Sequence, residues 1–339
     1  MLKNLFYASL LLCGSTPIYA QQDSAQHYFN KGTEEKNAKR WMVAAKHYDK
    51  AIQFNPKFKE AYLENGYANL EMRRTDVAKG HFMKVLDIEP GNASAIKELT
   101  ELFFSYRQYE KAIEYAQKCT TCPNAGRIIG QSQYELEDYA AAVKTLLGVI
   151  AKNPADAEAQ YAIGRSYLEM EEYKSAIPYY AKAIELDKTR NVWMYELGLQ
   201  YYNMNDFKNA LDQFTKAAES GYPKGNDFNE NVGYCQIYTG NFEAGEKTLL
   251  EIYAKKPGNK DILRDIAEIY YQRKLYDKSL DFCQKLLEMD KNDGKALYQA
   301  GLCFQKKGQT DRGQQMCDKA IEMDPSLASL RQKKMSAGM

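Results

Sequence analysis

The chain has 339 residues, of which 45% are hydrophobic and 27% charged. Its 46 Lys and Arg residues against 45 Asp and Glu residues give no electrostatic reason to expect nucleic acid or an anionic membrane surface as a partner. The length exceeds what one small core can serve, so the sequence predicts either about two domains or a repeat array whose core grows with length.

Residues 1–20 have the pattern of a secretory signal peptide. The cation Lys3 precedes an apolar run over 5–13, and a proline and the small residue Ala20 follow. We expect cleavage after Ala20 and a mature chain exported to the periplasm of a bacterium, without membrane insertion, because no later apolar run is longer. A lipoprotein anchored through Cys13 is the second alternative, because Leu12 stands where such signals usually carry a small residue.

A pair of small residues, 12 positions apart, recurs nine times along the rest of the chain. The first members of the pairs follow one another at steps of 34 residues, apart from one step of 30 and one of 35. This register predicts nine repeats over 25–327, starting near residues 25, 59, 93, 123, 157, 191, 226, 260 and 294. The pairs are Gly32 and Ala44, Gly66 and Ala78, Thr100 and Ala112, Gly130 and Ala142, Gly164 and Ala176, Gly198 and Ala210, Gly233 and Gly245, Ala267 and Ser279, and Gly301 and Gly313.

The repeat that starts at residue 157 shows why each unit should be a pair of helices. Its apolar and small residues recur at spacings of three and four in each half, which predicts two amphipathic helices. The small residues Gly164 and Ala176 would let the two helices approach closely, and Tyr173 would fill the turn between them. The residues that set this pattern are Ile163, Gly164, Tyr167, Ala176, Tyr180 and Ala183.

This pattern resembles the tetratricopeptide repeat family, whose Leu-Gly, aromatic, Ala, aromatic and Ala slots those six residues match, with Lys188 in place of the family's proline. The resemblance implies an all-α, right-handed α-solenoid of about nine helix-turn-helix repeats. Since terminal repeats need a cover, residues 326–339 are predicted to form a capping helix and tail. The short third repeat should stack more tightly, and the long sixth repeat, with Gly221 and Gly225, is a candidate hinge.

Cys119 and Cys122 form a C-x-x-C motif, which raises the question of thiol chemistry. In the repeat register the motif falls at the end of a second helix, where the helix dipole raises a thiol pKa, whereas reactive motifs begin helices. We therefore favour a structural disulfide or buried thiols over catalysis. Cys283 and Cys303, on neighbouring helices, are a second candidate disulfide, and buried unpaired thiols are the equal alternative.

Other motifs give no sign of an enzyme. The segment 240–248 nearly spells a phosphate-binding loop, but Glu246 replaces the required lysine and the register places the segment in a helical hairpin. His47 and His81 lie one repeat apart at the same slot, and no histidine lies near a cysteine in sequence or in the register. We expect no catalytic site, cofactor or metal.

A tyrosine-rich stripe remains as the candidate binding surface. It comprises the positions three before, one after and four after the first small residue of each pair, and in the family this stripe lines the concave groove. Aromatic residues occupy more than a third of these positions, against 12% of the whole chain. Rings of this kind suit a binding surface, although packing between helices explains them equally well. They are Phe29, Tyr67, Phe104, Tyr134, Tyr161, Tyr195, Tyr202, Tyr234, Tyr271 and Tyr298.

The charges along this first-helix stripe are mixed. Members of the family that clamp a terminal carboxylate use a lysine followed by an asparagine one turn later, whereas Lys97 is followed by Glu101 and Arg127 by Gln131. The clamp is therefore not carried over to this chain.

These observations predict a non-catalytic scaffold of the cell envelope that binds a partner protein or peptide segment in an aromatic-lined groove. The alternatives are a thiol-active or enzyme-accessory factor that uses Cys119 and Cys122, and a structural protein that self-associates through its end repeats.

Overall fold

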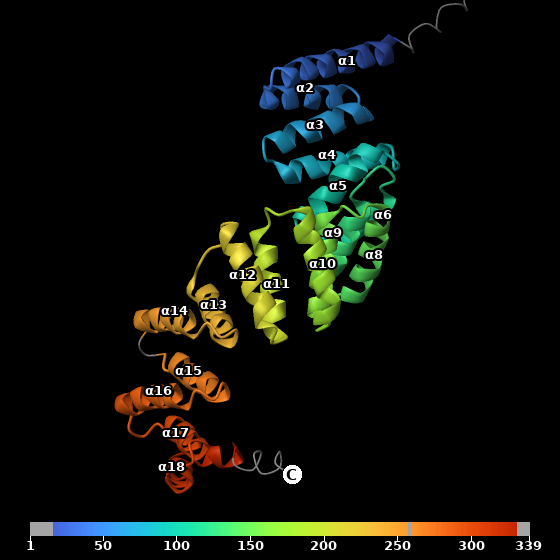
Figure 1. Cartoon of the computed structure of the whole chain (residues 1–339). Helices are drawn as coiled ribbons and strands as arrows, with labels where there is room; N and C mark the ends of the chain where they lie inside the picture. Colours follow the sequence, from blue (N-terminus) through green and yellow to red (C-terminus); the bar gives the residue numbers. More distant parts are fainter. Residues whose placement is uncertain (1–15, 257–258, 331–339) are drawn as a thin grey trace, which may run out of the picture. The chain divides into compact units, whose positions relative to one another are not determined.

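The computed structural model describes residues 16–256 and 259–330, and these residues form eighteen α-helices, one short 3-10 helix and no strand (Figure 1). The chain divides into two compact units, of which the first ends at Leu186 and the second begins at Asp187. Within each unit the helices follow one another as antiparallel hairpins, so the prediction of an all-α solenoid of about nine repeats is confirmed.

Each hairpin consists of a first and a second helix. The first helices are α1 (Thr16–Asn37), α3 (Lys59–Glu71), α5 (Ala93–Ser105), α7 (Ala125–Glu135), α9 (Ala157–Glu169), α11 (Asn191–Asn203), α13 (Asn226–Tyr238), α15 (Asp261–Gln272) and α17 (Gly294–Lys306). The second helices are α2 (Trp41–Phe54), α4 (Thr75–Ile88), α6 (Tyr109–Lys118), α8 (Tyr139–Lys152), α10 (Tyr173–Leu186), α12 (Phe207–Glu219), α14 (Phe242–Lys255), α16 (Tyr276–Met289) and α18 (Thr310–Met323).

The small residues of the repeat lie where the two helices of a hairpin touch. A Cβ atom added to Gly164 would stand 2.7 Å from the Tyr180 ring, and one added to Gly198 would stand 2.6 Å from the Phe214 ring. On the second helix, a Cβ atom on Gly245 would stand 2.6 Å from the Gly233 carbonyl oxygen. The first small residue thus makes room for a large side chain 16 positions later, and the second makes room for the backbone of the first helix.

The turn inside every hairpin has the same backbone. Three residues separate the two helices in all nine pairs, and the middle one has positive φ. The amide after it donates to a carbonyl five residues earlier, as Arg40 N does to Glu35 O, which is the Schellman arrangement that ends a helix. The positive-φ residues are Lys39, Arg73, Arg107, Glu137, Glu171, Asn205, Gly240, Lys274 and Gly308.

The short third repeat loses its residues from its second helix. Helix α6 has 10 residues where α2, α4 and α8 have 14, and it ends at the cysteine motif. The cluster of buried side chains under it runs without a break from Phe82 on α4 through Leu99 and Ala112 to Ile128 on α7. The four residues that α6 lacks relative to these helices amount to about one helical turn.

The long sixth repeat has its extra residue after α12. There Gly221 has a φ of 87°, and the next residue, Tyr222, stacks on the Tyr195 ring at 4.4 Å between centroids. The Asn191 amide donates to the Ser220 carbonyl oxygen at 2.9 Å. This loop, predicted as a candidate hinge, is thus fastened to α11, and Tyr222 also packs on the Phe228 ring of α13 at 5.7 Å between centroids.

The C-terminal end of the second unit is covered by a 3-10 helix, Pro325–Leu327, and by helical residues 328–330. Leu327 is only 4% exposed and packs with Tyr298, Cys317 and Ala320. The rest of the predicted capping segment, from residue 331, and residues 1–15 of the predicted signal peptide lie outside the described residues. Within the described ranges, none of the helices combines the length and the apolarity needed to cross a bilayer.

Candidate functional site

Four rings of the first-helix stripe pack inside their own hairpins, each against the large side chain that fills the space at the small residue. Tyr161 meets Tyr180 edge to face at 5.5 Å between centroids, and Tyr195 lies 5.5 Å from Phe214. The same relation joins Phe29 to Tyr48 and Tyr67 to Phe82.

Another four stripe rings pack at the turn of the hairpin, against the aromatic residue that begins the second helix. Tyr202 meets Phe207 at 5.4 Å and Tyr134 meets Tyr139 at 5.5 Å. Phe104 with Tyr109 and Tyr271 with Tyr276 repeat the contact. This contact accounts for four of the seven aromatic residues that begin second helices.

The structure therefore assigns the stripe rings a packing role, while part of each ring stays accessible in most repeats. Tyr234 and Tyr298 are buried, at 7% and 6% exposure, and the other eight are half-buried. Burial raises the pKa of Tyr202 to about 12 and raises the pKa of Tyr195. Because a raised pKa keeps each hydroxyl protonated, these side chains can donate hydrogen bonds at any physiological pH.

Hydroxyl and charged groups of the stripe connect successive first helices. Tyr134 Oη donates to Glu169 on the next first helix at 3.0 Å, and Tyr234 Oη donates to Asp265 at 2.7 Å. Lys36 pairs with Glu64 at 2.7 Å across the first two hairpins. Side chains of the stripe thus link successive first helices at several points within the two units.

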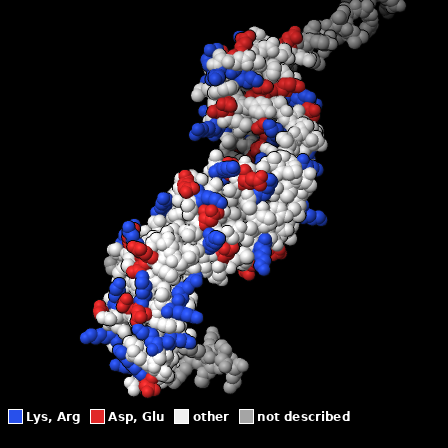
Figure 2. Space-filling view, viewed as in Figure 1, with Lys and Arg blue, Asp and Glu red and all other residues white. Residues whose placement is uncertain are grey.

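Two arginines of the stripe also reach the cap of the following first helix. Arg127 pairs with Asp156 at 3.1 Å, and Arg264 pairs with Asp293 at 2.8 Å. Each of these aspartates also accepts from a backbone amide of the helix that it begins, at 3.0 Å. By contrast, Lys97 and Glu101 on α5 are exposed. Figure 2 shows basic and acidic side chains interspersed over the face in view.

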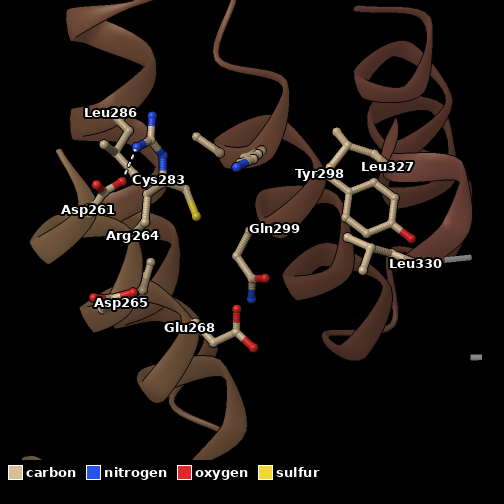
Figure 3. Close-up of a pocket in the computed structure, with 13 residues that line it drawn as sticks. Asp261, Arg264, Asp265, Glu268, Cys283, Leu286, Tyr298, Gln299, Leu327 and Leu330 are labelled. Carbon is tan, nitrogen blue, oxygen red and sulfur yellow. Dashed lines mark hydrogen bonds and ion pairs between the residues drawn. The ribbon is translucent and has the colours of Figure 1, made fainter. Parts of the chain in front are cut away.

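A cavity of about 330 Å³ opens on this stripe between α15 and α17 (Figure 3). Its floor is apolar and comes from buried residues, among them Leu286, Ala296 and Leu327, and Leu330 forms an exposed edge. Stripe residues from both helices contribute to the wall. The predicted stripe residue Tyr298 belongs to this wall; the other nine predicted rings do not.

The polar side of the cavity is mostly acidic. Asp261, Asp265 and Glu268 lie along one face of α15, at spacings of four and three residues. In Figure 3 the Gln299 amide and the Glu268 carboxylate point toward each other across the cavity. Sequence reasoning placed Glu268 in the stripe but missed Asp265, Gln299 and the two C-terminal leucines, because they lie outside the three stripe positions and meet only when α15, α17 and the end of the chain are assembled.

The cysteine motif lies at the C-terminal end of α6 and forms a disulfide, Cys119–Cys122, with 5.5 Å between the Cα atoms. Cys119 is 8% exposed. Cys283 and Cys303, the other candidate pair, are free buried thiols, and the Cys303 thiol donates instead to Ser279 Oγ at 3.2 Å.

The other motifs considered as signs of an enzyme, the segment 240–248 and the histidines, lie within the packed helical hairpins. The segment 240–248 includes the start of α14, and its Gly245 is buried against α13. Burial lowers the pKa of His81, and Tyr62 lies 5.9 Å from its ring. Among the described residues, no group of three or more His, Cys, Asp and Glu side chains is arranged to hold a metal ion.

Comparison with known proteins finds matches to family models described as "Tetratricopeptide repeat". One model matches residues 129–191, 195–259 and 236–296, and a second matches 294–327. Together they cover more than half of the chain.

Curated relatives share part of this region. A rice protein (Oryza sativa subsp. japonica), DnaJ protein P58IPK homolog B, is 25% identical over 167 residues, which are 43% of this chain and 35% of that protein. An Arabidopsis thaliana protein, Protein CTR9 homolog, is 32% identical over 108 residues, 32% of this chain and 10% of that protein. The chain thus spans about a third of the first relative's length and a tenth of the second's.

Solved structures of similar fold include YrrB, described as a TPR protein with an unusual peptide-binding site. It has 23% identity and a TM-score of 0.40, over 56% of this chain and 97% of that one. The P58(IPK) TPR domain has 15% identity and a TM-score of 0.30, over 88% of this chain and 93% of that one. These values describe a likeness in fold and assign no ligand to this chain.

Proposed function

Because this chain belongs to the tetratricopeptide repeat family, we propose that it is a non-catalytic scaffold that binds a partner protein or peptide segment along its first-helix stripe. The observation that supports this proposal most directly is the cavity between α15 and α17, which opens on the stripe and is walled partly by stripe residues. A concave site with an apolar floor and a few polar groups is what a bound side chain requires.

The half-buried rings of the stripe support the same proposal. A ring whose inner face packs on its hairpin is held in one orientation, so a partner that covers the outer face loses little additional rotamer entropy. Tyr134 and Tyr202 are examples, since each is fixed by a ring at the turn and remains half-buried.

Site-specific photo-crosslinking tests the scaffold function. A benzoylphenylalanine placed at Glu101, an exposed stripe position on α5, should capture one dominant partner in cells. The same group at Gln117, an exposed position on the second helix α6, provides the control. Equal products from both positions, or none from Glu101 and from further exposed stripe positions such as Lys97, would contradict binding along the stripe.

We also propose that the mature chain is exported after cleavage behind Ala20, on the strength of the first 20 residues alone. The intact mass of the protein recovered from the cell envelope tests this proposal. A mature chain that begins at Gln21 supports it. An acylated chain that begins at Cys13 would replace it with a membrane-anchored scaffold.

A further inference from the structure

The cavity between α15 and α17 has an excess of negative charge once its internal pairs are counted. Arg264 is held by two carboxylates, Asp261 at 2.7 Å and Asp293 at 2.8 Å, so it does not offset the others. Asp265 accepts from the Tyr234 hydroxyl, and Glu268 accepts from the Gln272 amide, and neither neutral donor removes a charge. Lys295, on the opposite wall, is the other cation among the lining residues.

The acidic surface continues from the cavity onto the preceding first helix. Burial, together with the neighbouring charges of Asp227 and Asp265, raises the pKa of Glu230 on α13. The carboxylates of α13 and α15 are therefore close enough to repel one another, and a cation bound among them would relieve that repulsion.

Two buried donors beside these acids have no acceptor among the described residues. They are Gln299 Nε2 and Arg264 Nε. The acceptor beside the Gln299 amide is the Cys303 thiol, whose sulfur accepts hydrogen bonds only weakly. Buried donors usually have a partner, and leaving one unsatisfied costs about 1–3 kcal/mol. An incoming carbonyl oxygen would satisfy the donor that Gln299 presents to the cavity.

The apolar parts of the cavity fit the stem of a long side chain. Leu327 is buried on the floor, and Leu330, beside it, is 47% exposed. The hydrocarbon stem of Lys or Arg packs on such a surface while its charged head reaches polar groups nearby.

We propose that this cavity binds an extended segment of a partner protein through a Lys or Arg side chain, with the cationic head at Asp265 and Glu268, the stem on Leu327 and Leu330, and a main-chain carbonyl at Gln299. This proposal rests on the scaffold function and names its ligand chemistry. An acidic partner is disfavoured by the same carboxylates, which would lie against its own charges.

Fluorescence anisotropy with a defined probe tests the proposal on the full mature chain. The probe is an end-capped, labelled peptide of sequence GALKLKAG, and the control peptides replace both lysines by glutamine or by glutamate. We expect the lysine peptide to bind at least tenfold more tightly than either control, and to weaken as NaCl rises from 0.05 to 0.5 M. Equal binding of the three peptides would overturn the proposal.

Three variants test whether peptide binding depends on this cavity or on the general charge of the surface. Glu268→Gln should weaken the lysine peptide about tenfold, while Glu322→Gln, which removes the same charge from an exposed position on α18, should leave binding unchanged. Gln299→Met removes the unsatisfied donor, so it should melt no earlier than the parent and yet bind about fivefold more weakly. If both cavity variants bind as the parent does, the assignment is wrong.

The chain's own basic residues are the rival occupant. Arg331, Lys333 and Lys334 follow directly after Leu330 in the sequence. If changing all three to glutamine tightened peptide binding tenfold, the occupant of the cavity would be the C-terminal end of this chain, and the assignment to a partner would be wrong.

Crosslinking from Glu101 in the Glu268→Gln variant distinguishes the cavity proposal from the scaffold proposal. Undiminished capture there, with no peptide selectivity, would reject the cavity and retain the scaffold.

Discussion

Seven non-glycine residues adopt a left-handed backbone in the hairpin turns, and this conformation costs an L-residue about 1–2 kcal/mol. Glu171, with a φ of 59°, is one of them. Glu171→Gly should therefore stabilise the protein by about 0.5–1 kcal/mol, because the relief of strain exceeds the added entropy of the unfolded chain. Lys174→Gly, in the exposed first turn of α10, should destabilise it by up to about 1 kcal/mol. Urea unfolding measures both, and equal signs for the two changes would contradict the argument.

Gly164 is a site where even a methyl group should not fit. The Cβ atom of Gly164→Ala would stand 2.7 Å from the Tyr180 ring, which is itself fully buried, so we expect a loss of about 1–3 kcal/mol by overpacking. Gly148→Ala is the matched control, because nothing lies within 4 Å of its Cβ position on α8. It should gain up to about 1 kcal/mol from helix propensity. A neutral Gly164→Ala variant in thermal unfolding would show that the helices separate easily.

Two buried thiols and one half-buried phenol should make the stability of the protein depend on pH in the alkaline range. Burial raises the pKa of Cys235, Cys283 and Tyr202 to about 12. In the unfolded chain these groups lose their protons at about 8.5 for Cys and about 10 for Tyr. The unfolded state is therefore favoured as pH rises, and the free energy of unfolding should be level below about pH 8 and fall between about pH 9 and 12.

Urea midpoints at pH 7.5, 9 and 10.5 check this expectation. Cys283→Ala removes one of the released protons, so its slope near pH 10.5 should be shallower by up to about 1.4 kcal/mol per pH unit. A midpoint that stays constant up to pH 10.5 would mean that these groups ionise without unfolding.

At the scale of helices, the aspartate that begins α17 joins two hairpins. Asp293 is 4% exposed at its side chain, caps α17 through the Ala296 amide at 3.0 Å, and pairs with Arg264 of α15. Asp293→Asn keeps a good cap but loses the ion pair, and Asp293→Ala loses both. We expect losses of about 1 and about 2–3 kcal/mol respectively.

Hydrogen exchange of the α15 and α17 amides resolves where this loss occurs. Relative to the parent protein, the amides of α15 and α17 should exchange faster in both variants. The increase should be smaller in α11 and α12, which belong to the same unit. If exchange became faster in α17 alone, Asp293 would act only as the cap of that helix, and the link to α15 would be contradicted.

The helices could be predicted from the sequence because apolar and small residues recur at helical spacing through every repeat. The hairpin turns could not, since only Asn205, Gly240 and Gly308 carry a residue typical of a left-handed turn, and the other six slots hold Lys, Arg or Glu. The positions of the stripe rings could be predicted from the sequence, but the residues that these rings contact could not. Whether Tyr195 faces a groove or a neighbour depends on Tyr222, in a loop that the repeat register does not cover.

At the scale of the whole molecule, each hairpin is buried only against its neighbours, so the ends of the array should be weak points. Deleting residues 326–339 removes Leu327 from Tyr298 and Ala320 and should lower solubility and speed hydrogen exchange most in α17 and α18. Deleting residues 21–24 from the mature chain should change neither property, because residues 22 and 23 are exposed and Ala25 keeps its place. A C-terminal deletion that is as soluble and heat-resistant as the parent would contradict the covering role of Leu327.

The constant three-residue turn has a consequence for how such a chain can change over generations. Because each hairpin closes on itself with the same backbone, the loops between hairpins are the places where length varies, as the six residues between α6 and α7 and between α12 and α13 show beside the four between α8 and α9. A duplication or loss of one whole period would leave every turn intact and change only which hairpins are neighbours. The molecule can therefore lengthen or shorten by whole units, while the chemistry of each stripe position is altered one residue at a time.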